Sequence, residues 1–424
     1  MHENVSVNLG NLLLSISDAL DLIDPTLAAH QQRTAFICWE VGRAAGLSEQ
    51  DTQQLFSAAL LHDIGALTPE EKISIHNNEV ENLETHCVFG NLIVEDVPAI
   101  KDSAQIIRHH HRKWADWGEP IDTPLVLKSQ ILVLSDLVER SLKRNKYILH
   151  QSDELISGTD ALSGTTIHPL VVDIFKEVAQ REEFWLDLTS SRLYSLLLNF
   201  GPFRKVDIDF ENIFSFTDLF RVIIDFRSHF TATHSSGIAA SAVAMAGSLG
   251  FTEAELALIG IAGYLHDLGK LVIPNSILEK PGSLNKNEYA IMKQHTYFTY
   301  MILNTISGLE QIAEWGAYHH EKLDGTGYPF HFSTKEIPLG SRILAIADIF
   351  TALAEDRPYR KRLGKAEIKD ILLDMANDGK LDKKVVKTLF DNYDEITKQM
   401  QDAQAAAMEF YEQRFSKRTK ESFG

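Results

Sequence analysis

Cysteine is scarce in this sequence, with only Cys38 and Cys87 among 424 residues. Both lie in apolar segments with helical spacing, where a thiol is more often buried and reduced than bridged. Long hydrophobic runs are also lacking, because none approaches the ~18 to 20 apolar residues that cross a bilayer. The N-terminus has no basic region ahead of an apolar one, so it shows no secretory signal. We therefore expect a cytoplasmic protein without disulfides.

Positive charge is in short supply as well, since 59 acidic residues outnumber 41 basic ones and leave a net charge of -18. Broad binding to DNA, RNA or an anionic membrane needs a basic face that replaces counterions. We therefore expect neither a nucleic-acid polymer nor a membrane as partner. A small anionic substrate needs only local cations. The C-terminal half carries such cations at Lys270, Arg342, Arg357, Arg360, Lys361 and Arg362.

Strand patterns are few, and residues 330–337 form the clearest short piece. Elsewhere apolar residues recur three and four apart, as on the buried face of a helix. Thr252 with Glu255, and more weakly Ser48 with Asp51, match the capping pattern of helix starts. In each case we expect the helix to run to a His-Asp pair and to end at the Gly that follows. The sequence predicts an all-α fold of two helical bundles, with at most a short β-hairpin in the C-terminal domain.

An internal repeat relates the two halves. Residues 62–65, His-Asp-Ile-Gly, match residues 266–269, His-Asp-Leu-Gly, at an offset of 204 that also takes His30 to His234. The offset grows to 209 for His86 with His295, and for His110 and His111 with His319 and His320, and to 212 for Asp136 with Asp348. A chain beyond roughly 250 to 300 residues normally divides into domains. We expect domains at 1–204 and 205–424, divided near the Gly-Pro pair at 201–202.

The second copy carries five histidines and two carboxylates of ligand type. A His-Asp pair can offer a metal one imidazole and one carboxylate that bridges to a second ion. Nitrogen and oxygen ligands suit iron, manganese or zinc rather than metals that prefer thiolate, and two ions fit the set better than one. The predicted ligands are His234, His266, Asp267, His295, His319, His320 and Asp348.

Longer motifs surround these ligands. Lys270 follows the His-Asp-Leu-Gly run, Glu-Lys-Leu-Asp-Gly-Thr-Gly-Tyr-Pro follows His320, and residues 357–360, Arg-Pro-Tyr-Arg, follow Asp348. On these motifs, residues 215 to 400 or so resemble the HD-GYP phosphodiesterases of bacterial cyclic dinucleotide signalling, and the tandem arrangement is similar to that of the cyclic GMP-AMP phosphodiesterases in this family. The resemblance implies a hydrolase that opens cyclic GMP-AMP or cyclic di-GMP to a linear dinucleotide, and it leaves the choice between them open.

The resemblance also implies roles for individual residues. One metal would be held by His234, His266, Asp267 and Asp348, and the other by Asp267, His295, His319 and His320, with iron or manganese favoured and nickel or zinc also open. Asp267 would bridge the ions, and a water activated between them would attack phosphorus. Lys270 would contact the phosphate and stabilise or protonate the departing ribose oxygen. The predicted nucleotide contacts are Tyr328, Arg357 and Arg360.

One position departs from part of this family. Members with a third metal carry a Glu four residues before the first His, one helical turn away and on the same face. Here that residue is Phe230, which cannot bind a metal. We therefore expect two ions in the C-terminal domain.

The first copy keeps the ligand types but not their surroundings. Its candidate cage is His30, His62, Asp63, His86, His110, His111 and Asp136. Ala66 stands at the position of Lys270, and the Gly-Tyr-Pro loop has become residues 114–120, Trp-Ala-Asp-Trp-Gly-Glu-Pro. The pattern predicts a degenerate HD domain that does not hydrolyse the substrate, with a structural, regulatory or oxygen-sensing metal site or an empty cage.

Other interpretations remain open at this point. The chain as a whole fits a non-catalytic diiron sensor or interaction protein, although an intact Lys270 argues against it. A general HD nucleotide phosphohydrolase would not need the Gly-Tyr-Pro loop. A single buried His is usually a hydrogen-bonded core residue, and the basic runs at 109–113 and 357–362 also suit solvated helix ends. The sequence leaves open a homodimer or a signalling protein as partner.

Overall fold

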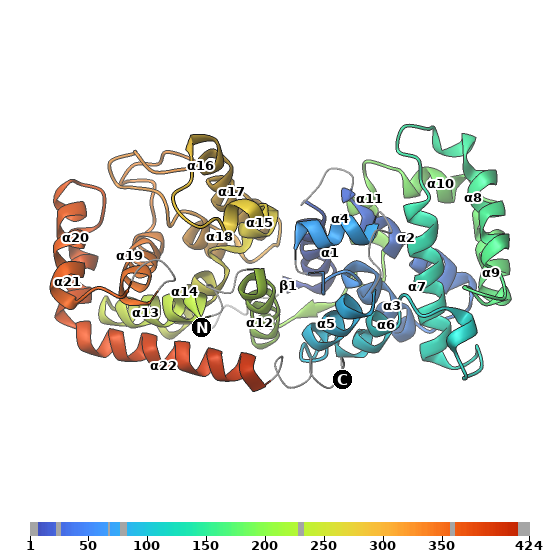
Figure 1. Cartoon of the computed structure of the whole chain (residues 1–424), viewed down its shortest axis with the longest axis horizontal. Coiled ribbons are helices and arrows are strands. Elements are labelled where there is room, and N and C mark those ends of the chain that lie inside the picture. The colour runs from blue at the N-terminus through green and yellow to red at the C-terminus, as the bar shows by residue number, and fades with distance from the viewer. Residues whose placement is uncertain are drawn as a thin grey trace. The chain divides into compact units, whose positions relative to one another are not determined.

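The computed structural model describes residues 7–22, 27–66, 68–76, 83–227, 233–356 and 361–413. The chain forms two compact units, Val5–Ser215 and, for the C-terminal part, Phe216–Gly424. Helices make up most of both units (Figure 1). The predicted all-α fold is therefore confirmed, and the two units are described separately below.

The N-terminal unit holds helices α1 to α11 and a short sheet. Its strands are β1 (Val7–Asn8) and β2 (Asp207–Ile208), which pair antiparallel. Its helices are α1 (Leu9–Asp21), α2 (His30–Ala44), α3 (Glu49–Leu61), α4 (Pro69–His76), α5 (Glu84–Val94), α6 (Ala104–Arg108), α7 (Pro124–Arg140), α8 (Ser152–Gly158), α9 (Pro169–Ala179), α10 (Glu182–Leu188) and α11 (Leu193–Phe200).

The C-terminal unit begins within α12 (Phe210–Arg227), because the division between the units falls after Ser215. Its other helices are α13 (His234–Ser248), α14 (Glu253–Leu265), α15 (Asn275–Leu278), α16 (Lys286–Met292), α17 (Gln294–Asn304), α18 (Glu310–Ala317), α19 (Leu339–Ala354), α20 (Lys365–Asn377), α21 (Lys383–Asp391) and α22 (Tyr393–Tyr411). A short 3-10 helix, η6 (Leu268–Val272), follows α14.

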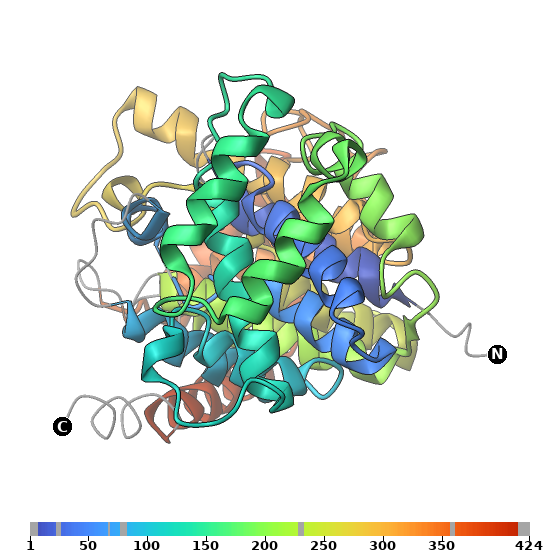
Figure 2. The ribbon, with the colours of Figure 1, turned by 90° about the vertical axis from the view of Figure 1, so that its right-hand side faces the viewer.

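The repeat is visible as a repeated packing pattern. In the first unit α2 packs against α3 and α7, and in the second α13 packs against α14 and α19. Helix α9 adds a layer on α2 and α7, and the green helices that follow α7 lie nearest the viewer in Figure 2. In the second unit α22 lies along α13 instead. Each central helix therefore begins at a predicted ligand and is enclosed by apolar neighbours.

The predicted caps are present at the matching helices. Thr252 and Glu255 form a capping box at the start of α14, and the Ser48 side chain accepts a hydrogen bond from the Asp51 amide at the start of α3. These caps satisfy backbone N–H groups that a helix start leaves unpaired. The caps fix where both helices begin. Because the two helices have the same length, the caps also fix where the His-Asp pairs that follow them lie.

The glycines after the His-Asp pairs were predicted to end the helices, but the structure gives them another role. Helix α14 already ends at Leu265, and neither Gly65 nor Gly269 has a positive φ. A Cβ on Gly269 would lie 1.9 Å from the backbone oxygen of His295, and one on Gly65 would lie 2.0 Å from that of His86. Glycine is needed there because two ligand-bearing segments pass within backbone contact, so the prediction of a helix-ending Gly was wrong.

The sheet lies where the sequence did not indicate it. The predicted hairpin region of the second unit contains an isolated bridge between Asp324 and Ser333 within the described residues, whereas the two-stranded sheet joins the two ends of the first unit. Each strand has two residues, which is too short for an alternating pattern to show.

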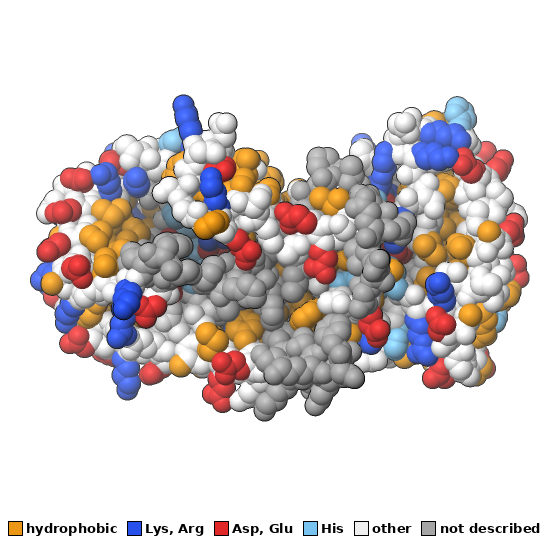
Figure 3. All heavy atoms as spheres, viewed as in Figure 1, with side chains coloured by type: hydrophobic (Ala, Val, Ile, Leu, Met, Phe, Trp, Pro, Cys, Tyr) orange, Lys and Arg blue, Asp and Glu red, His pale blue; other side chains and the backbone are white. Residues whose placement is uncertain are grey.

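Three expectations about the surface and the thiols can be compared with the structure. Cys38 and Cys87 are buried and unbridged, as predicted. On the face seen in Figure 3, basic and acidic side chains are interspersed. Among the helices of the described segments, none has both the length and the apolar character that crossing a bilayer requires. The cytoplasmic location stays a prediction.

Candidate metal centre

The predicted ligands of the C-terminal unit stand at the ends of helices that meet in its core. His234 is the first residue of α13, His266 caps the end of α14, and His295 is the second residue of α17. His319 and His320 follow α18, while Asp348 lies within α19. His234, His266, Asp267, His295 and His319 are each at most 5% exposed.

Three of these side chains form a first group. The ligand atoms of His234, His266 and Asp348 all lie within 4.8 Å of one another. His234 Nε2 is 3.3 Å from Asp348 Oδ1. One tetrahedral or octahedral ion with bonds of about 2.0 to 2.2 Å holds its ligand atoms at such separations.

Three further histidines form a second group, and Asp267 stands between the two. The ligand atoms of His295, His319 and His320 also lie within 4.8 Å of one another. Asp267 Oδ2 is 3.1 Å from His266 Nε2, whereas Asp267 Oδ1 is 3.5 Å from His295 Nε2. Its two oxygens therefore face different groups, which is the geometry of a carboxylate that bridges two ions.

The histidine rings are held so that one nitrogen points into the cluster. The Nδ1 atoms of His266, His295 and His319 lie 2.7, 2.7 and 2.6 Å from the backbone oxygens of Gly263, Met292 and Gly316. This contact fixes the tautomer and leaves Nε2 as the lone-pair nitrogen. The three Nε2 atoms are buried without a hydrogen-bond partner in the described structure. Unpaired buried nitrogens cost stability, so the donor set fits bound divalent transition metals.

The charges of the second ligand group agree with this fit, whereas in the first group Asp348 and Glu355 outweigh burial and raise the pKa of His234 to about 9. Burial lowers the pKa of His295 to about 3 and also lowers the pKa values of His319 and His320, so all three are neutral imidazoles. Burial alone would raise the pKa of Asp267, but His266 and Lys270 hold it well below its usual range. The carboxylate is therefore ionised, as a metal ligand must be.

Lys270 lies at the edge of the cluster. Its Nζ is 2.6 Å from Asp267 Oδ2, and its side chain is 20% exposed. The 3-10 helix η6 brings it there, one short turn after the His-Asp pair. The structure thus places a cation against the predicted bridging carboxylate and within reach of solvent.

The loop with the Gly-Tyr-Pro motif brings Tyr328 to the second group. Its ring centroid lies 4.9 Å from that of His320. The buried Glu321 carboxylate holds the loop by accepting hydrogen bonds from the amides of Phe330 and Phe332 at 2.7 and 3.1 Å. Gly327 allows the close approach, since a Cβ there would lie 2.4 Å from Glu321 Cα. The predicted contacts Arg357 and Arg360, and Phe230, lie outside the described residues.

Glu355 is a residue of this site that sequence reasoning missed. Its Oε1 lies 3.0 Å from His234 Nδ1, and its Oε2 accepts a hydrogen bond from Gln404 Nε2 of α22 at 3.1 Å. Glu355 therefore orients His234 from outside the cluster. It stands seven residues after Asp348, two helical turns along the same face, and that spacing was the available signal.

The predicted cage of the N-terminal unit is brought together in the same way. Its candidate ligands fall into two groups, His30 with His62 and Asp63, and His86 with Cys87, His110 and His111, each with ligand atoms within 4.8 Å. Asp136 Oδ1 lies 3.5 Å from His30 Nε2. Cys87 is an addition that sequence reasoning did not include.

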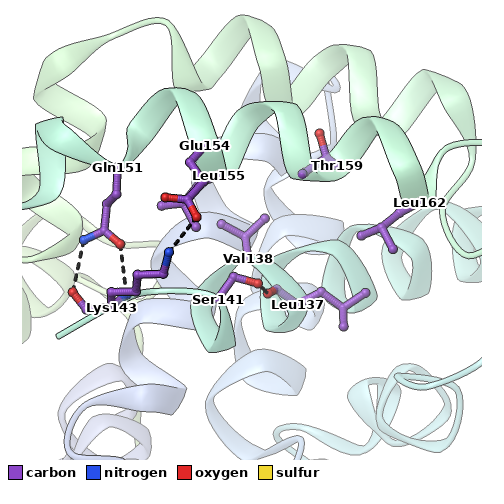
Figure 4. Close-up of a pocket in the computed structure, with 10 residues that line it drawn as sticks. Leu137, Val138, Ser141, Lys143, Gln151, Glu154, Leu155, Thr159 and Leu162 are labelled. Atoms are coloured by element: carbon purple, nitrogen blue, oxygen red, sulfur yellow. Dashed lines mark hydrogen bonds and ion pairs between the residues drawn. The ribbon is translucent and has the colours of Figure 1, made fainter. Parts of the chain in front are cut away.

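A separate cavity of about 380 Å³ lies between α7 and α8 (Figure 4). Lys143 Nζ lies 2.5 Å from Glu154 Oε1 at its polar edge, and Leu137, Val138 and Leu162 line its apolar side. Its lining contains neither a predicted ligand nor a predicted substrate contact. The candidate site therefore rests on the side-chain clusters.

Comparisons with known proteins agree with the two clusters. Models of the HD domain match residues 27–150 and 218–385. The chain is a tandem HD-domain protein. A crystal structure of a cyclic GMP-AMP-specific phosphodiesterase of Vibrio cholerae matches it with a TM-score of 0.64 and 23% identity, covering 92% of this chain and 98% of that one. This likeness shows the tandem helical fold.

Two curated relatives of this tandem HD-domain protein differ in how much of it they match. The 3'3'-cGAMP-specific phosphodiesterase 1 of Vibrio cholerae is 28% identical over 91% of this chain and 92% of the relative. The cyclic di-GMP phosphodiesterase of Thermotoga maritima is 36% identical over 35% of this chain and 41% of the relative. The resemblance to HD-GYP phosphodiesterases, predicted from motifs, is confirmed.

Proposed function

We propose that the C-terminal HD domain hydrolyses a cyclic dinucleotide to a linear dinucleotide. The observation that carries the proposal is the position of Asp267 between two groups of ligands, with Lys270 2.6 Å from one of its oxygens. Divalent ions bound there would supply Lewis acidity, activate a water for attack on phosphorus and neutralise the phosphate oxygens. The similarity to two kinds of cyclic dinucleotide phosphodiesterase supports this reaction.

Lys270 has the placement of a proton donor. Cleavage of a phosphodiester leaves a ribose alkoxide, which needs a proton as the bond breaks. An ammonium group beside the bridging carboxylate is partly exposed, so it can contact a bound phosphate and give up that proton. Turnover then depends on Lys270 even though metal binding does not.

Tyr328 has the placement of a substrate contact. Burial raises the pKa of its hydroxyl, so the group stays protonated and can donate a hydrogen bond to a phosphate or a nucleotide. Its ring lies 4.9 Å from that of His320 and 6.1 Å from that of Tyr289. We also keep Arg357 and Arg360 as predicted contacts on the strength of the sequence motif.

Cyclic GMP-AMP is the substrate that the relatives favour. The relative that matches nearly the whole chain acts on 3'3'-cGAMP, whereas the cyclic di-GMP relative matches only about a third of it. The all-nitrogen-and-oxygen ligand set of the C-terminal unit favours iron or manganese as the working metal. We further propose that the protein acts in the cytoplasm.

One assay tests both the reaction and the substrate. Purified full-length protein is loaded with manganese or anaerobic iron(II) and given cyclic GMP-AMP, cyclic di-GMP or cyclic di-AMP, with His266→Ala as the matched inactive control. We expect a linear dinucleotide from cyclic GMP-AMP at the highest kcat/KM and none from the control. A metal-loaded protein that hydrolyses none of the three would overturn the function, and a preference for cyclic di-GMP would overturn the substrate alone.

A further inference from the structure

We propose that the N-terminal HD domain is a second metal centre, which binds divalent transition metals in a closed cage and performs no hydrolysis. The proposal concerns residues separate from the catalytic cluster, so it does not depend on the proposed reaction. It rests on the positions of the ligand atoms, on the groups that orient them, on two unpaired polar atoms and on the elements that close the cage.

The first half of the cage lies between α2, α3 and α7. His30 Nε2 is 3.3 Å from His62 Nε2, 3.7 Å from Asp63 Oδ2 and 3.5 Å from Asp136 Oδ1. Two nitrogens and two carboxylate oxygens thus surround one small volume. Their separations are those of atoms around an ion with bonds of about 2.0 to 2.2 Å.

The second half shares Asp63 with the first. Its Oδ1 is 3.7 Å from His86 Nε2 and 3.8 Å from His110 Nε2, and these two nitrogens are 3.1 Å apart. The ring of His111 lies 5.0 Å from that of His86. The two oxygens of Asp63 therefore face different groups, as those of Asp267 do.

The ligands are oriented from outside the cage. His62 Nδ1 lies 2.9 Å from the Ala59 oxygen and His110 Nδ1 lies 2.7 Å from the Ile107 oxygen, so both present Nε2 to the interior. These contacts match those of His266 and His319 in the other unit. Fixed tautomers with inward Nε2 atoms are the arrangement that metal ligation needs.

His30 is oriented by a carboxylate that the other unit lacks at that position. Its Nδ1 pairs with Glu139, which is fully buried and also bonds Arg33 Nε and an Arg144 nitrogen, each at 2.7 Å. Thr351 stands at the matching position of the second copy, where Glu355 makes the corresponding contact instead. In both units a carboxylate thus contacts Nδ1 of the first histidine, but the two carboxylates come from positions that do not match in the repeat.

Two buried polar atoms are suited to contact a bound cation. Asp63 Oδ1 and His111 Nε2 are buried and have no hydrogen-bond partner among the described residues, and Asp63 as a whole is 8% exposed. An unpaired buried acceptor lowers the stability of the fold, and a charged one lowers it further. A bound cation removes that cost at both atoms.

A thiol lies next to the second half. Cys87 Sγ is 3.8 Å from His86 Nε2 and donates to the Leu83 oxygen at 3.2 Å, whereas Thr296 occupies this position in the second copy. Sulfur is a softer ligand than any group in the C-terminal cluster. We therefore expect zinc or iron(II) rather than manganese to be held best here.

Among the described residues, Arg140 and the end of α4 cover the first half of the cage. Arg140 bonds Asp136 Oδ2 at 3.3 Å, and its other nitrogen donates to the backbone oxygens of Ile75 and His76 at the end of α4. The Asp136 side chain is 3% exposed, against 17% for Asp348. Closed sites hold structural metals, whereas catalytic sites keep an open position.

The missing catalytic groups agree with this closure. Ala66 stands where Lys270 would be and is 4% exposed. In the region of the lost loop, Arg112 lies over the ring of Trp117 at 4.1 Å, so that segment packs on itself. Among the described residues, the N-terminal centre thus has ligands for a metal but no lysine at the position that matches Lys270.

Metal analysis of full-length variants tests the proposal. The substitutions His266→Ala, Asp267→Ala, His295→Ala and His319→Ala together remove ligands from both C-terminal groups, so metal that remains after zinc loading and desalting belongs to the N-terminal unit. We expect this variant to keep half of the wild-type zinc, and we expect none after His62→Ala, Asp63→Ala, His86→Ala and His110→Ala are added. Circular dichroism confirms that each protein is folded, and His111→Gln serves as a milder variant with the same expected direction. A folded C-terminal variant that holds no zinc overturns the proposal.

Cobalt(II) gives a second readout that does not depend on activity. In the C-terminal variant we expect a thiolate-to-cobalt absorption band, and we expect Cys87→Thr, which copies Thr296, to remove the band while cobalt stays bound. An unchanged spectrum in Cys87→Thr overturns the sulfur ligand. A chelator should also lower the melting temperature of the C-terminal variant, but not that of the protein with both cages removed. If the chelator changes the two melting temperatures equally, the N-terminal unit holds no structural metal.

Discussion

The two HD domains place the same ligand types at the same helix ends, yet they differ in what lies beside them. Asp63 and Asp267 each face two groups of histidines. Beside Asp267 stands Lys270, whereas Ala66 stands beside Asp63, and Arg140 with α4 closes the N-terminal cage. The comparison separates two features: helix ends bring the same ligand types together in both units, whereas Lys270 and the Gly-Tyr-Pro loop are present in the second unit alone.

The largest expected effect comes from the bridging carboxylate of the C-terminal unit. Asp267→Ala should remove turnover together with the C-terminal metal, because one side chain faces both ligand groups. Elemental analysis alongside an activity assay measures both losses. If C-terminal ions remain at the wild-type amount, Asp267 does not bridge them.

A change that separates chemistry from metal binding is Lys270→Ala, which copies Ala66. Turnover should fall by about 10² to 10⁴, the usual contribution of a positioned acid, while metal content stays the same. Steady-state kinetics with metal analysis of the same sample tests this. Near-normal turnover would remove Lys270 from the catalytic role, and Lys270→Arg shows whether a cation alone suffices.

The orientation of the first histidine gives a smaller effect. Glu355→Gln should weaken C-terminal metal binding by about 10- to 100-fold, as loss of an outer carboxylate partner typically does. Competition with a chromophoric chelator measures the affinity, and the exposed Glu253→Gln on α14 is the matched control. Equal affinities for the two variants would show that His234 needs no carboxylate behind it.

The smallest expected effect concerns the loop that carries the His-Asp pair. Thr299 Oγ1 accepts from the Gly269 amide at 2.9 Å and donates to the His266 oxygen at 3.0 Å, whereas Gly90 stands at this position in the first copy. Thr299→Val should cost about 1 to 3 kcal/mol, because it leaves that buried amide unpaired. Hydrogen exchange at residues 266–270 should quicken in this variant but not in Thr299→Ser. Unchanged hydrogen exchange would mean that the loop is stable without the Thr299 hydrogen bonds.

The helical fold and the two ligand sets were predictable from the sequence. Most of the ligands stand at helix ends, and capping residues and the repeat spacing mark these ends in the sequence. The resemblance supplied the assignment of His234 and Asp348 to one group and of His295, His319 and His320 to the other, and the structure brings each group together. The carboxylates that orient the first histidine of each unit were not predictable from motifs. Glu139 contacts His30 Nδ1 and Glu355 contacts His234 Nδ1, but the two residues do not occupy matching positions in the repeat. The closure by α4 and the close approach at Gly269 depend on tertiary packing, which no local pattern encodes.

The central claim is that the chemistry resides in the second HD domain, and matched substitutions in the two copies test it most directly. Turnover of a cyclic dinucleotide is measured for full-length His62→Ala and His266→Ala, with C-terminal metal content determined for each. We expect His266→Ala to lose turnover and His62→Ala to keep most of it. Loss of turnover in His62→Ala while the C-terminal metal stays bound would contradict the account, since the first domain would then take part in the reaction.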